Sequence, residues 1–433
     1  MDLTERVWAA VERLRPEIVD TLSAAIRIPS INPNYPGQDY AAVVGGEGRV
    51  SRLFADVYAA AGCEVDVFGL VEGRENAVGR LRGTGGGRSL IYNGHVDVVP
   101  PDPAEEWVDA DPWSGRVADG RVWGRGASDM KSGIVAQAFA ARALREAGIA
   151  LRGDLILEAV VGEENMEHLL GTTACIDRGY RADAAIVSEA SGPPVPLAVC
   201  PVSPGAFLFT VTVEGKATHS SMRGETLAPG GRGERVGVSA IDRLLVVYEA
   251  LRRLEQEWES TKRHPLFEPR HFSIMPGVIR AWPKTGPVTG GTPDRAFMEV
   301  VAWAHPDDDA EVVHAEVEAC ISRAAEADSW LAGHPPRVEW THHWPRSSLD
   351  PSHPIVAATA RAHEQATGRP AVIRGFGAVE DTTFFNAAGI PAISYGPGDL
   401  RVAHAIDESV DIEEVVTATA TFALLAAEWC GVA

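Results

Sequence analysis

The sequence contains few cysteines and no visible export signal. Its 433 residues include five cysteines, and none is spaced as in a zinc ribbon or a redox motif; they are Cys63, Cys175, Cys200, Cys320 and Cys430. The first residues enter an amphipathic helical pattern instead of a charged start followed by an apolar stretch. We therefore expect a cytoplasmic protein whose thiols stay reduced and idle.

Positive charge and long apolar segments are scarce as well. Lys and Arg together number 39 against 60 Asp and Glu, which gives a net charge of −21. Nucleic acids and anionic membranes are bound by clustered Lys and Arg, so this balance argues against both as partners. No apolar run approaches the length of about 20 residues that a membrane-spanning helix needs.

The first part of the chain alternates helical patterns with short apolar runs, which is typical of a sheet covered by helices on both faces. Four of the runs have the composition of buried strands, because Val, Ile and aromatic residues pack well on a pleated surface. They span residues 89–93, 155–161, 184–188 and 392–395. The length of the chain favours two domains.

Between residues 205 and 344 the order of the expected elements changes. Strands are expected at 206–214, 272–280, 295–303 and 337–341, and helices at 236–259 and 307–327. This β-α-β-β-α-β order is the ferredoxin-like arrangement. We therefore predict one domain formed by residues 1–204 and 345–433, with a second domain, 205–344, inserted into it. The stretch 224–235, rich in Gly and Arg, is expected to be a mobile loop.

Side chains that bind metals follow the expected strands at their carboxyl ends, where ligands collect in open parallel sheets. The set consists of His95, Asp97, Glu163, Glu164, Glu189 and His404, together with Asp129, which follows a Gly-rich turn. Histidines combined with carboxylates suit divalent ions such as zinc, manganese or cobalt. The lack of thiolates argues against a closed structural zinc site. The sequence therefore predicts an open, catalytic metal centre.

Any one of these residues alone would have a simpler explanation. A single Asp or Glu after a strand is more often a helix N-cap or a solvated loop residue. Asp129 stands just before a helical pattern that begins near Ser132, so a capping role competes with a ligand role. The set as a whole favours metal binding. His342 and His343, by contrast, are far from any carboxylate cluster and are expected to be packing or surface residues.

The sequence resembles the dinuclear metallopeptidase family that includes acetylornithine deacetylase, succinyl-diaminopimelate desuccinylase, aminoacylases and glutamate carboxypeptidases. The resemblance covers nearly the whole chain. It is carried by residues 95–100 (HVDVVP), 124–133 (GRGASDMKSG), the Glu163–Glu164 pair, 215–221 (GKATHSS), and 396–398 (GPG) followed by His404. It implies an α/β catalytic domain with a doubly wound mixed sheet, and an inserted ferredoxin-like α+β lid and dimerisation domain.

The resemblance also implies a ligand set. Two divalent metal ions (zinc, manganese or cobalt) would be bound, one by His95 and Glu189 and the other by Glu164 and His404. Asp129 would bridge both ions, and the peptide bond that follows it would be cis.

The other matching residues would orient the ligands or take part in the reaction. Asp97 would orient His95. Glu163 would be the general base that accepts a proton from a metal-activated water and delivers it to the leaving nitrogen. His219, in the inserted domain, would stabilise the developing oxyanion, with a strand-end surface histidine as the simpler alternative. The expected reaction is hydrolysis of an amide, N-acyl or peptide C–N bond in a small molecule.

Three other functions are compatible with parts of the sequence. A hydrolytic deaminase or amidohydrolase acting on an aromatic or otherwise non-peptide amine would use the same activated water. A catalytically inactive binding protein on the same fold is disfavoured by the complete ligand set and by Glu163. A phosphate-binding loop around Gly124, Gly126 and Lys131 is disfavoured because Met130 stands where a Walker loop requires Gly.

Two positions of the inserted domain bear on the substrate. Family members that recognise an α-carboxylate carry an Asn and an Arg at positions that align with Gly290 and Trp303. Neither residue pairs with a carboxylate, whereas an indole offers a face for stacking. We therefore expect a flat or aromatic substrate instead of an ordinary N-acyl amino acid, with Arg280 or Arg295 as candidates for a displaced cation.

The resemblance further implies a homodimer formed through the inserted domain. The ferredoxin-like sheet expected there has exposed edges that pair readily. In such a dimer His219 acts either on its own active site or on that of the partner.

Overall fold

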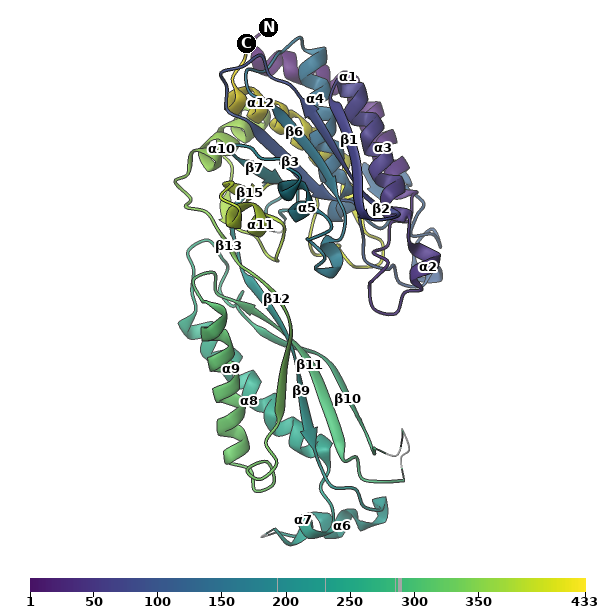
Figure 1. Ribbon diagram of the computed structural model, residues 1–433, viewed down its shortest axis with the longest axis vertical. Helices are drawn as coiled ribbons and strands as arrows, with labels where there is room; N and C mark the ends of the chain where they lie inside the picture. The colour runs from purple at the N-terminus through teal and green to yellow at the C-terminus, as the bar shows by residue number, and fades with distance from the viewer. Residues whose placement is uncertain (193, 230, 285, 287–289) are drawn as a thin grey trace. The chain divides into compact units, whose positions relative to one another are not determined.

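The computed structural model describes residues 1–192, 194–229, 231–284, 286 and 290–433. The chain forms two compact units (Figure 1), one made of Met1–Ser203 and Ser347–Ala433 and the other of Pro204–Arg346. The second unit is an insertion in the sequence of the first. The boundaries expected from the sequence lie at 204/205 and 344/345.

The first unit is built on a nine-stranded mixed sheet. In spatial order its strands are β1 (Glu64–Val71), β2 (Arg74–Leu81), β6 (Leu155–Val160), β3 (Leu90–His95), β7 (Ala185–Val187), β15 (Ala392–Ser394), β8 (Val199–Ser203) and β13 (Ser347–Ser348), and β14 (Ile373–Gly375) pairs with β8. Strands β6, β3, β7 and β15 are mutually parallel, whereas β1, β2 and β13 pair antiparallel with their neighbours. All four strands expected from the apolar runs are present.

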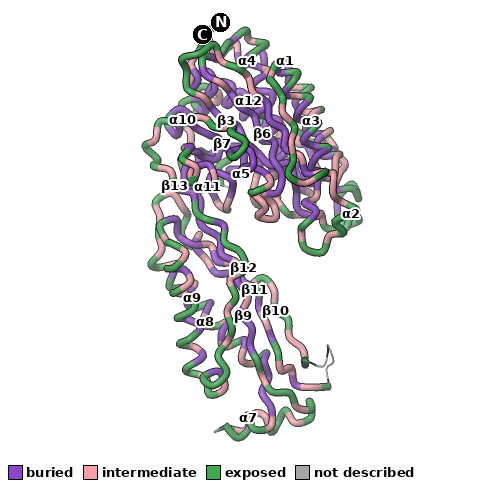
Figure 2. Tube along the Cα trace, in the orientation of Figure 1, coloured by how far each residue is buried: buried purple, intermediate pink, exposed green. Residues whose placement is uncertain are grey.

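Helices cover both faces of this sheet. One face carries α1 (Leu3–Ile26), α3 (Gly46–Ala61), α4 (Ser132–Glu146), α10 (Pro354–Thr367) and α12 (Ile412–Cys430), and the other carries α5 (Thr172–Asp177) and α11 (Thr382–Ala387). Side chains alternate along each strand, so Tyr92 packs with the first group of helices and Ile91 with the second. Figure 2 shows buried residues concentrated along the central strands. The predicted doubly wound mixed sheet is confirmed.

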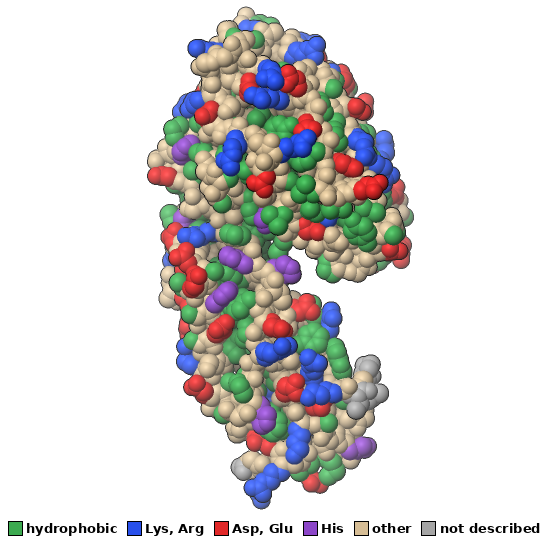
Figure 3. Space-filling model, in the orientation of Figure 1, with side chains coloured by type: hydrophobic (Ala, Val, Ile, Leu, Met, Phe, Trp, Pro, Cys, Tyr) green, Lys and Arg blue, Asp and Glu red, His purple; other side chains and the backbone are tan. Residues whose placement is uncertain are grey.

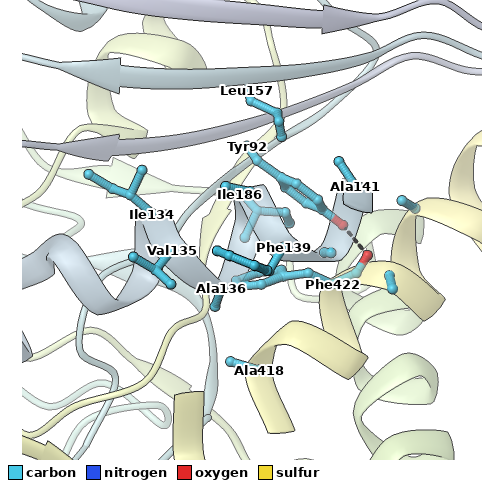
Figure 4. Packing of buried hydrophobic residues seen from close by; sticks show 14 of the residues in the cluster. Tyr92, Ile134, Val135, Ala136, Phe139, Ala141, Leu157, Ile186, Ala418 and Phe422 are labelled. Carbon is cyan, nitrogen blue, oxygen red and sulfur yellow. Dashed lines mark hydrogen bonds between the residues drawn. The ribbon is translucent and has the colours of Figure 1, made fainter. Parts of the chain in front are cut away.

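A packed aromatic cluster fixes the end of β3 (Figure 4). Tyr92 of β3 lies against Phe422 of α12, with 5.0 Å between the ring centroids, and Phe139 of α4 joins the same cluster. The Tyr92 hydroxyl also donates a hydrogen bond to the backbone carbonyl of Phe422. Because Tyr92 is three residues before His95, this packing leaves little freedom for the residue that ends the strand.

The inserted unit has the predicted ferredoxin-like order. Its main elements are β9 (Gly205–Glu214), α8 (Ala240–Thr261), β10 (Ile274–Trp282), β11 (Arg295–Ala304), α9 (Ala310–Glu326) and β12 (Arg337–Trp344). The strands form an antiparallel sheet in the order β10-β11-β9-β12. Helices α8 and α9 pack on one face of it through apolar side chains such as Leu244, Val247, Val313 and Val317.

The loop expected at 224–235 is not a loop throughout. Its described residues include two short helices, α6 (Arg223–Thr226) and α7 (Arg232–Val236), while Gly230 lies outside the described residues. The helices approach closely at Gly233, whose backbone N–H donates to the carbonyl of Ala228. A Cβ at Gly233 would lie 2.1 Å from the carbonyl oxygen of Thr226, so only glycine permits this packing.

A three-stranded sheet joins two distant segments of the first unit. It has the order β16 (Ser409–Asp411), β5 (Arg121–Trp123) and β4 (Val117–Ala118). Ser409 pairs with Trp123, so the chain just before residue 129 runs beside the chain just after residue 404.

The charged side chains, the cysteines and the helices have the following properties. Acidic and basic side chains are interspersed on the face shown in Figure 3. The five cysteines form no disulfide. Among the described residues, no helix combines the length and apolar character needed to cross a membrane.

Candidate metal centre

The predicted ligands meet at the carboxyl edge of the parallel strands. His95 is the last residue of β3, and Glu189 follows the end of β7 by two residues. Glu163 and Glu164 begin the turn that follows β6. Since β3 pairs in parallel with both β6 and β7, the three strand ends lie side by side and point these residues to one place.

Asp129 reaches the same place from a turn that depends on glycine. Gly124 and Gly126 have φ angles of +134° and +86°, values that L side chains rarely adopt. A Cβ at Gly126 would also lie 2.9 Å from the side chain of Val98. The Asp129–Met130 peptide bond is cis, as the family resemblance implies. The glycines of the GRG segment thus serve the turn that presents Asp129.

The imidazole of His95 is surrounded by carboxylates. Its Nε2 lies 3.1 Å from Oδ1 of Asp129 and 3.3 Å from Oε1 of Glu189. It lies 3.8 Å from Oε2 of Glu163. The His95 side chain is buried, with 1% exposed. The Nε2 of His95 thus lies within 3.3 Å of a carboxylate oxygen of Asp129 and of one of Glu189.

The second oxygen of Asp129 faces a different histidine. Its Oδ2 lies 3.4 Å from Nε2 of His404, which in turn is 3.1 Å from Oε2 of Glu164. His404 has a φ of +59° and a side chain that is half-exposed. Asp129 thus stands between two groups of donors, one on the side of His95 and one on the side of His404.

This donor set fits a divalent metal. Ligand atoms of His95, Asp129 and Glu164 lie within 4.8 Å of one another. Glu164 Oε1 is a buried oxygen without a hydrogen-bond partner in the structure, which is unusual for a carboxylate. A bound cation would satisfy it. Imidazole and carboxylate donors suit zinc, manganese or cobalt.

Asp97 holds the turn that carries the two glutamates. Its Oδ1 accepts the backbone N–H of Gly162 at 2.9 Å and that of Glu163 at 3.3 Å. Its Oδ2 accepts the N–H of Glu164 at 3.1 Å. The Nδ1 of His95 lies 2.9 Å from the backbone oxygen of Asp97 and 3.7 Å from its carboxylate. The His95 ring is thus oriented mainly by the main chain of Asp97.

Burial raises the pKa values of the glutamates around this centre, that of Glu163 among them. Burial raises the pKa of the Glu163 carboxyl well above the usual range, and the charges of Glu189 and Glu164 add to this effect against that of His95. Burial and the charge of Asp129 also raise the pKa of Glu189 to about 7. A carboxyl with a raised pKa is suited to accept and return a proton near neutral pH.

Contacts between the two histidines and the carboxylates shift the pKa values of both partners. Although burial disfavours the charge, contacts with Asp129 and Glu189 raise the pKa of His95 well above its usual range. The charge of Glu164 and the contact with Asp129 raise that of His404 in the same way. Burial opposes ionisation of Asp129, but the hydrogen bonds from both histidines outweigh it and hold the Asp129 pKa far below normal. A divalent cation would replace the two imidazolium protons.

His219, the remaining predicted site residue, belongs to the inserted unit. It follows the turn after β9, and its backbone pairs with Gly291. Its exposed imidazole contacts the hydroxyl of Ser221, with 2.8 Å between Nδ1 and Oγ. The metal ligands predicted from the sequence all lie in the first unit, whereas His219 lies in the second.

Sequence reasoning missed a carboxylate that supports this centre. Glu408 is fully buried and accepts the backbone N–H groups of Ser128 and Asp129 at 2.8 and 3.0 Å. The only sequence signal is its place four residues after His404, and an acidic residue in a loop is too common to stand out.

The sequence is similar to metallohydrolases that act on C–N bonds. The model of peptidase family M20/M25/M40 matches residues 91–428. The chain is 31% identical over an alignment of 443 residues to N-formyl-4-amino-5-aminomethyl-2-methylpyrimidine deformylase of Halalkalibacterium halodurans, covering 99% of this chain and 98% of that protein. The protein of the same name from Bacillus subtilis is 34% identical over 381 residues, covering 85% and 86%. Succinyl-diaminopimelate desuccinylase of Paracoccus denitrificans is 42% identical over 157 residues, which are 35% of this chain.

Solved structures resemble the chain in fold. The di-peptidase Dug1p of Saccharomyces cerevisiae superposes with a TM-score of 0.74, at 16% sequence identity, covering 99% of this chain and 98% of that structure. Human carnosine dipeptidase 1 gives the same TM-score and identity, covering 99% of both chains.

Proposed function

Since this chain belongs to peptidase family M20/M25/M40, it is a metal-dependent hydrolase of C–N bonds, and we propose that it removes the formyl group from an N-formylated aminomethylpyrimidine. The products of this hydrolysis are formate and the free amine. The observation that carries the proposal is identity over most of the chain. The two relatives named as pyrimidine deformylases are 31% and 34% identical over 99% and 85% of this chain, whereas the probable succinyl-diaminopimelate desuccinylase of Staphylococcus epidermidis is 24% identical over 74%.

The lid residues support a substrate without a carboxylate. Trp303 lies on β11, half-buried, and stands where carboxylate-recognising family members are expected to carry Arg. Gly290 is exposed and accepts the backbone N–H of Ser220 at 3.0 Å, so it offers no side chain to a ligand. A formylated aminomethylpyrimidine is flat and has no carboxylate, which matches these two positions.

Each residue of the centre then has a role. We assign His95 and Glu189 to one divalent ion, Glu164 and His404 to the other, and Asp129 to both. When bound, such ions polarise a carbonyl oxygen and lower the pKa of a water molecule.

Glu163 lies beside this ligand set without being needed as a ligand. It accepts a proton from the attacking water as the new C–O bond forms. It returns that proton to the amine nitrogen as the C–N bond breaks, so that formate and amine leave with their protons balanced. His219 donates to the developing oxyanion, from its own chain or from the partner in a homodimer formed through the inserted unit.

A comparison of substrates tests this function. Metal-loaded protein is assayed with N-formyl-4-amino-5-aminomethyl-2-methylpyrimidine, with N-formyl and N-succinyl amino acids, and with their carboxamides, while formate and ammonia are measured separately. We expect stoichiometric formate from the pyrimidine and weak turnover of the amino acids. Ammonia without formate would instead show a hydrolytic deaminase. Efficient hydrolysis of N-acyl amino acids that is lost on amidation of the carboxylate would contradict the proposal.

A further inference from the structure

Glu408 connects the turn of Asp129 to the loop of His404. Its Oε1 accepts the backbone N–H groups of Ser128 and Asp129 at 2.8 and 3.0 Å. Its backbone belongs to the segment that continues from His404 into β16. One carboxylate therefore binds the N–H of the bridging ligand Asp129 and that of the preceding residue. It lies four residues after His404, a ligand of the second group.

The other oxygen of Glu408 completes the connection. Oε2 accepts the N–H of Gly126 at 3.1 Å and the Nη1 of Arg125 at 2.7 Å. The same Nη1 lies 3.4 Å from the carbonyl oxygen of Ala405, and the N–H of Gly124 donates to the Glu408 carbonyl at 2.8 Å. Both segments are thus fastened to each other through side-chain and main-chain bonds around one buried ion pair.

We propose that Glu408 is a positioning residue for the metal centre, which holds Asp129 and His404 in the one arrangement that lets Asp129 serve both groups of donors. The inference rests on the metal-dependent hydrolysis proposed above. Glu408 contacts neither substrate nor ion in this role. It acts through the two ligands whose backbone segments it joins.

The number of donors explains why the residue is a carboxylate. A carboxylate has about four lone-pair sites and Glu408 meets four donors, three backbone N–H groups and Arg125. An amide has a single acceptor oxygen and would turn its own NH2 toward two of these donors. The Glu408 carboxylate is fully buried (0% exposed), and a buried carboxylate is costly to desolvate unless its oxygens are hydrogen-bonded. The local structure therefore depends on both oxygens of Glu408.

The test is a metal titration of Glu408→Gln. Metal-stripped parent and variant are titrated with Mn²⁺ in a calorimeter, and thermal unfolding of the stripped proteins is recorded. We expect two ions in the parent and a loss of about 10- to 100-fold in affinity for at least one ion in the variant, as for other residues that orient ligands. With saturating metal, kcat should fall at least tenfold while KM stays within about twofold. Glu408→Asp, which keeps both oxygens, should recover part of the loss.

Glu413→Gln is the matched control. It removes the same charge five residues further along, where Glu413 is 73% exposed and pairs with Arg15, and it should behave as the parent. A folded Glu408→Gln variant with parental affinities and kcat overturns the proposal, even if its melting temperature falls, because that result describes a merely structural residue. If Glu408→Gln does not fold, Arg125→Met is titrated instead, and parental affinities there overturn it equally. A parent protein that binds no Mn²⁺ would overturn the metal-dependent function as well.

Discussion

The carboxylate of Asp97 accepts the backbone N–H of Glu164, with 3.1 Å between Oδ2 and the nitrogen. Asp97, two residues after His95, is thus hydrogen-bonded to Glu164, which lies beside His404 in the second donor group. The His95 imidazole uses the main-chain oxygen of Asp97 instead. Asp97 thus fixes the turn that carries the general base as well as the orientation of His95.

This relationship predicts the effect of Asp97→Asn. The amide has one acceptor oxygen in place of two and must leave buried N–H groups of the turn unpaired. We expect metal affinity to fall about 10- to 100-fold, measured by calorimetry on metal-stripped protein. Asp56→Asn, on the exposed side of α3, is the control. Equal affinities in Asp97→Asn and the control would show that the turn does not depend on Asp97.

Removal of metal should abolish turnover. The described residues of the centre offer histidines and carboxylates, and we assign the nucleophile to a water molecule. Dialysis against a chelator should therefore reduce formate release to background, and Zn²⁺, Mn²⁺ or Co²⁺ should restore it. Formate release is followed against metal content from elemental analysis. Undiminished turnover in protein shown to be metal-free would refute this.

Glu163→Gln should separate catalysis from metal binding. The amide cannot accept and return a proton, so kcat should fall by about 100- to 10,000-fold. Metal content should remain near that of the parent, because Glu163 is not among the assigned ligands. Steady-state kinetics and elemental analysis of the same preparation decide the matter. Loss of an ion together with activity would make Glu163 a ligand.

Glu158→Gln should change how stability depends on pH. Glu158 of β6 is fully buried, and burial raises its pKa to about 8 from 4.5. The pKa of Glu158 is higher in the folded than in the unfolded protein. Its contribution to the free energy of unfolding is therefore complete below about pH 4.5 and is lost as pH rises through about 8. We compare the free energy of unfolding of Glu158→Gln with that of the parent at each pH. The difference should favour the variant by about 1 kcal/mol or more at pH 8 compared with pH 5. Urea unfolding at both pH values measures this, and parallel stability profiles would contradict it.

A mixing experiment tests the proposed homodimer and the place of His219. Inactive His219→Ala and Glu163→Ala proteins are combined under conditions of subunit exchange, and the mixed dimers are isolated by two different tags. If His219 acts on the partner's site, one intact site forms in each mixed dimer and activity recovers to about half of the parental value per dimer. No recovery in isolated mixed dimers assigns His219 to its own chain.

Local patterns in the sequence determined the elements of the fold. The apolar runs at 89–93 and 155–161 become β3 and β6, because buried parallel strands need Val, Ile and aromatic residues whatever their partners are. The β-α-β-β-α-β order of the inserted unit is likewise a property of successive segments. The same reasoning selected His95 and Glu164, because side chains that follow parallel strands collect at one edge. Asp129, selected after a Gly-rich turn, meets them in the structure.

Contacts between distant segments determine which of these side chains face each other. That Asp129 turns one oxygen to His95 and the other to His404 depends on two segments 275 positions apart in the chain, 404 minus 129, being joined by β5 and β16. Three donors to Asp97 and three to Glu408 are backbone N–H groups, which every residue except proline carries and which therefore leave no mark on the sequence. A local pattern records which side chains are present, whereas long-range packing decides which backbone donors they reach.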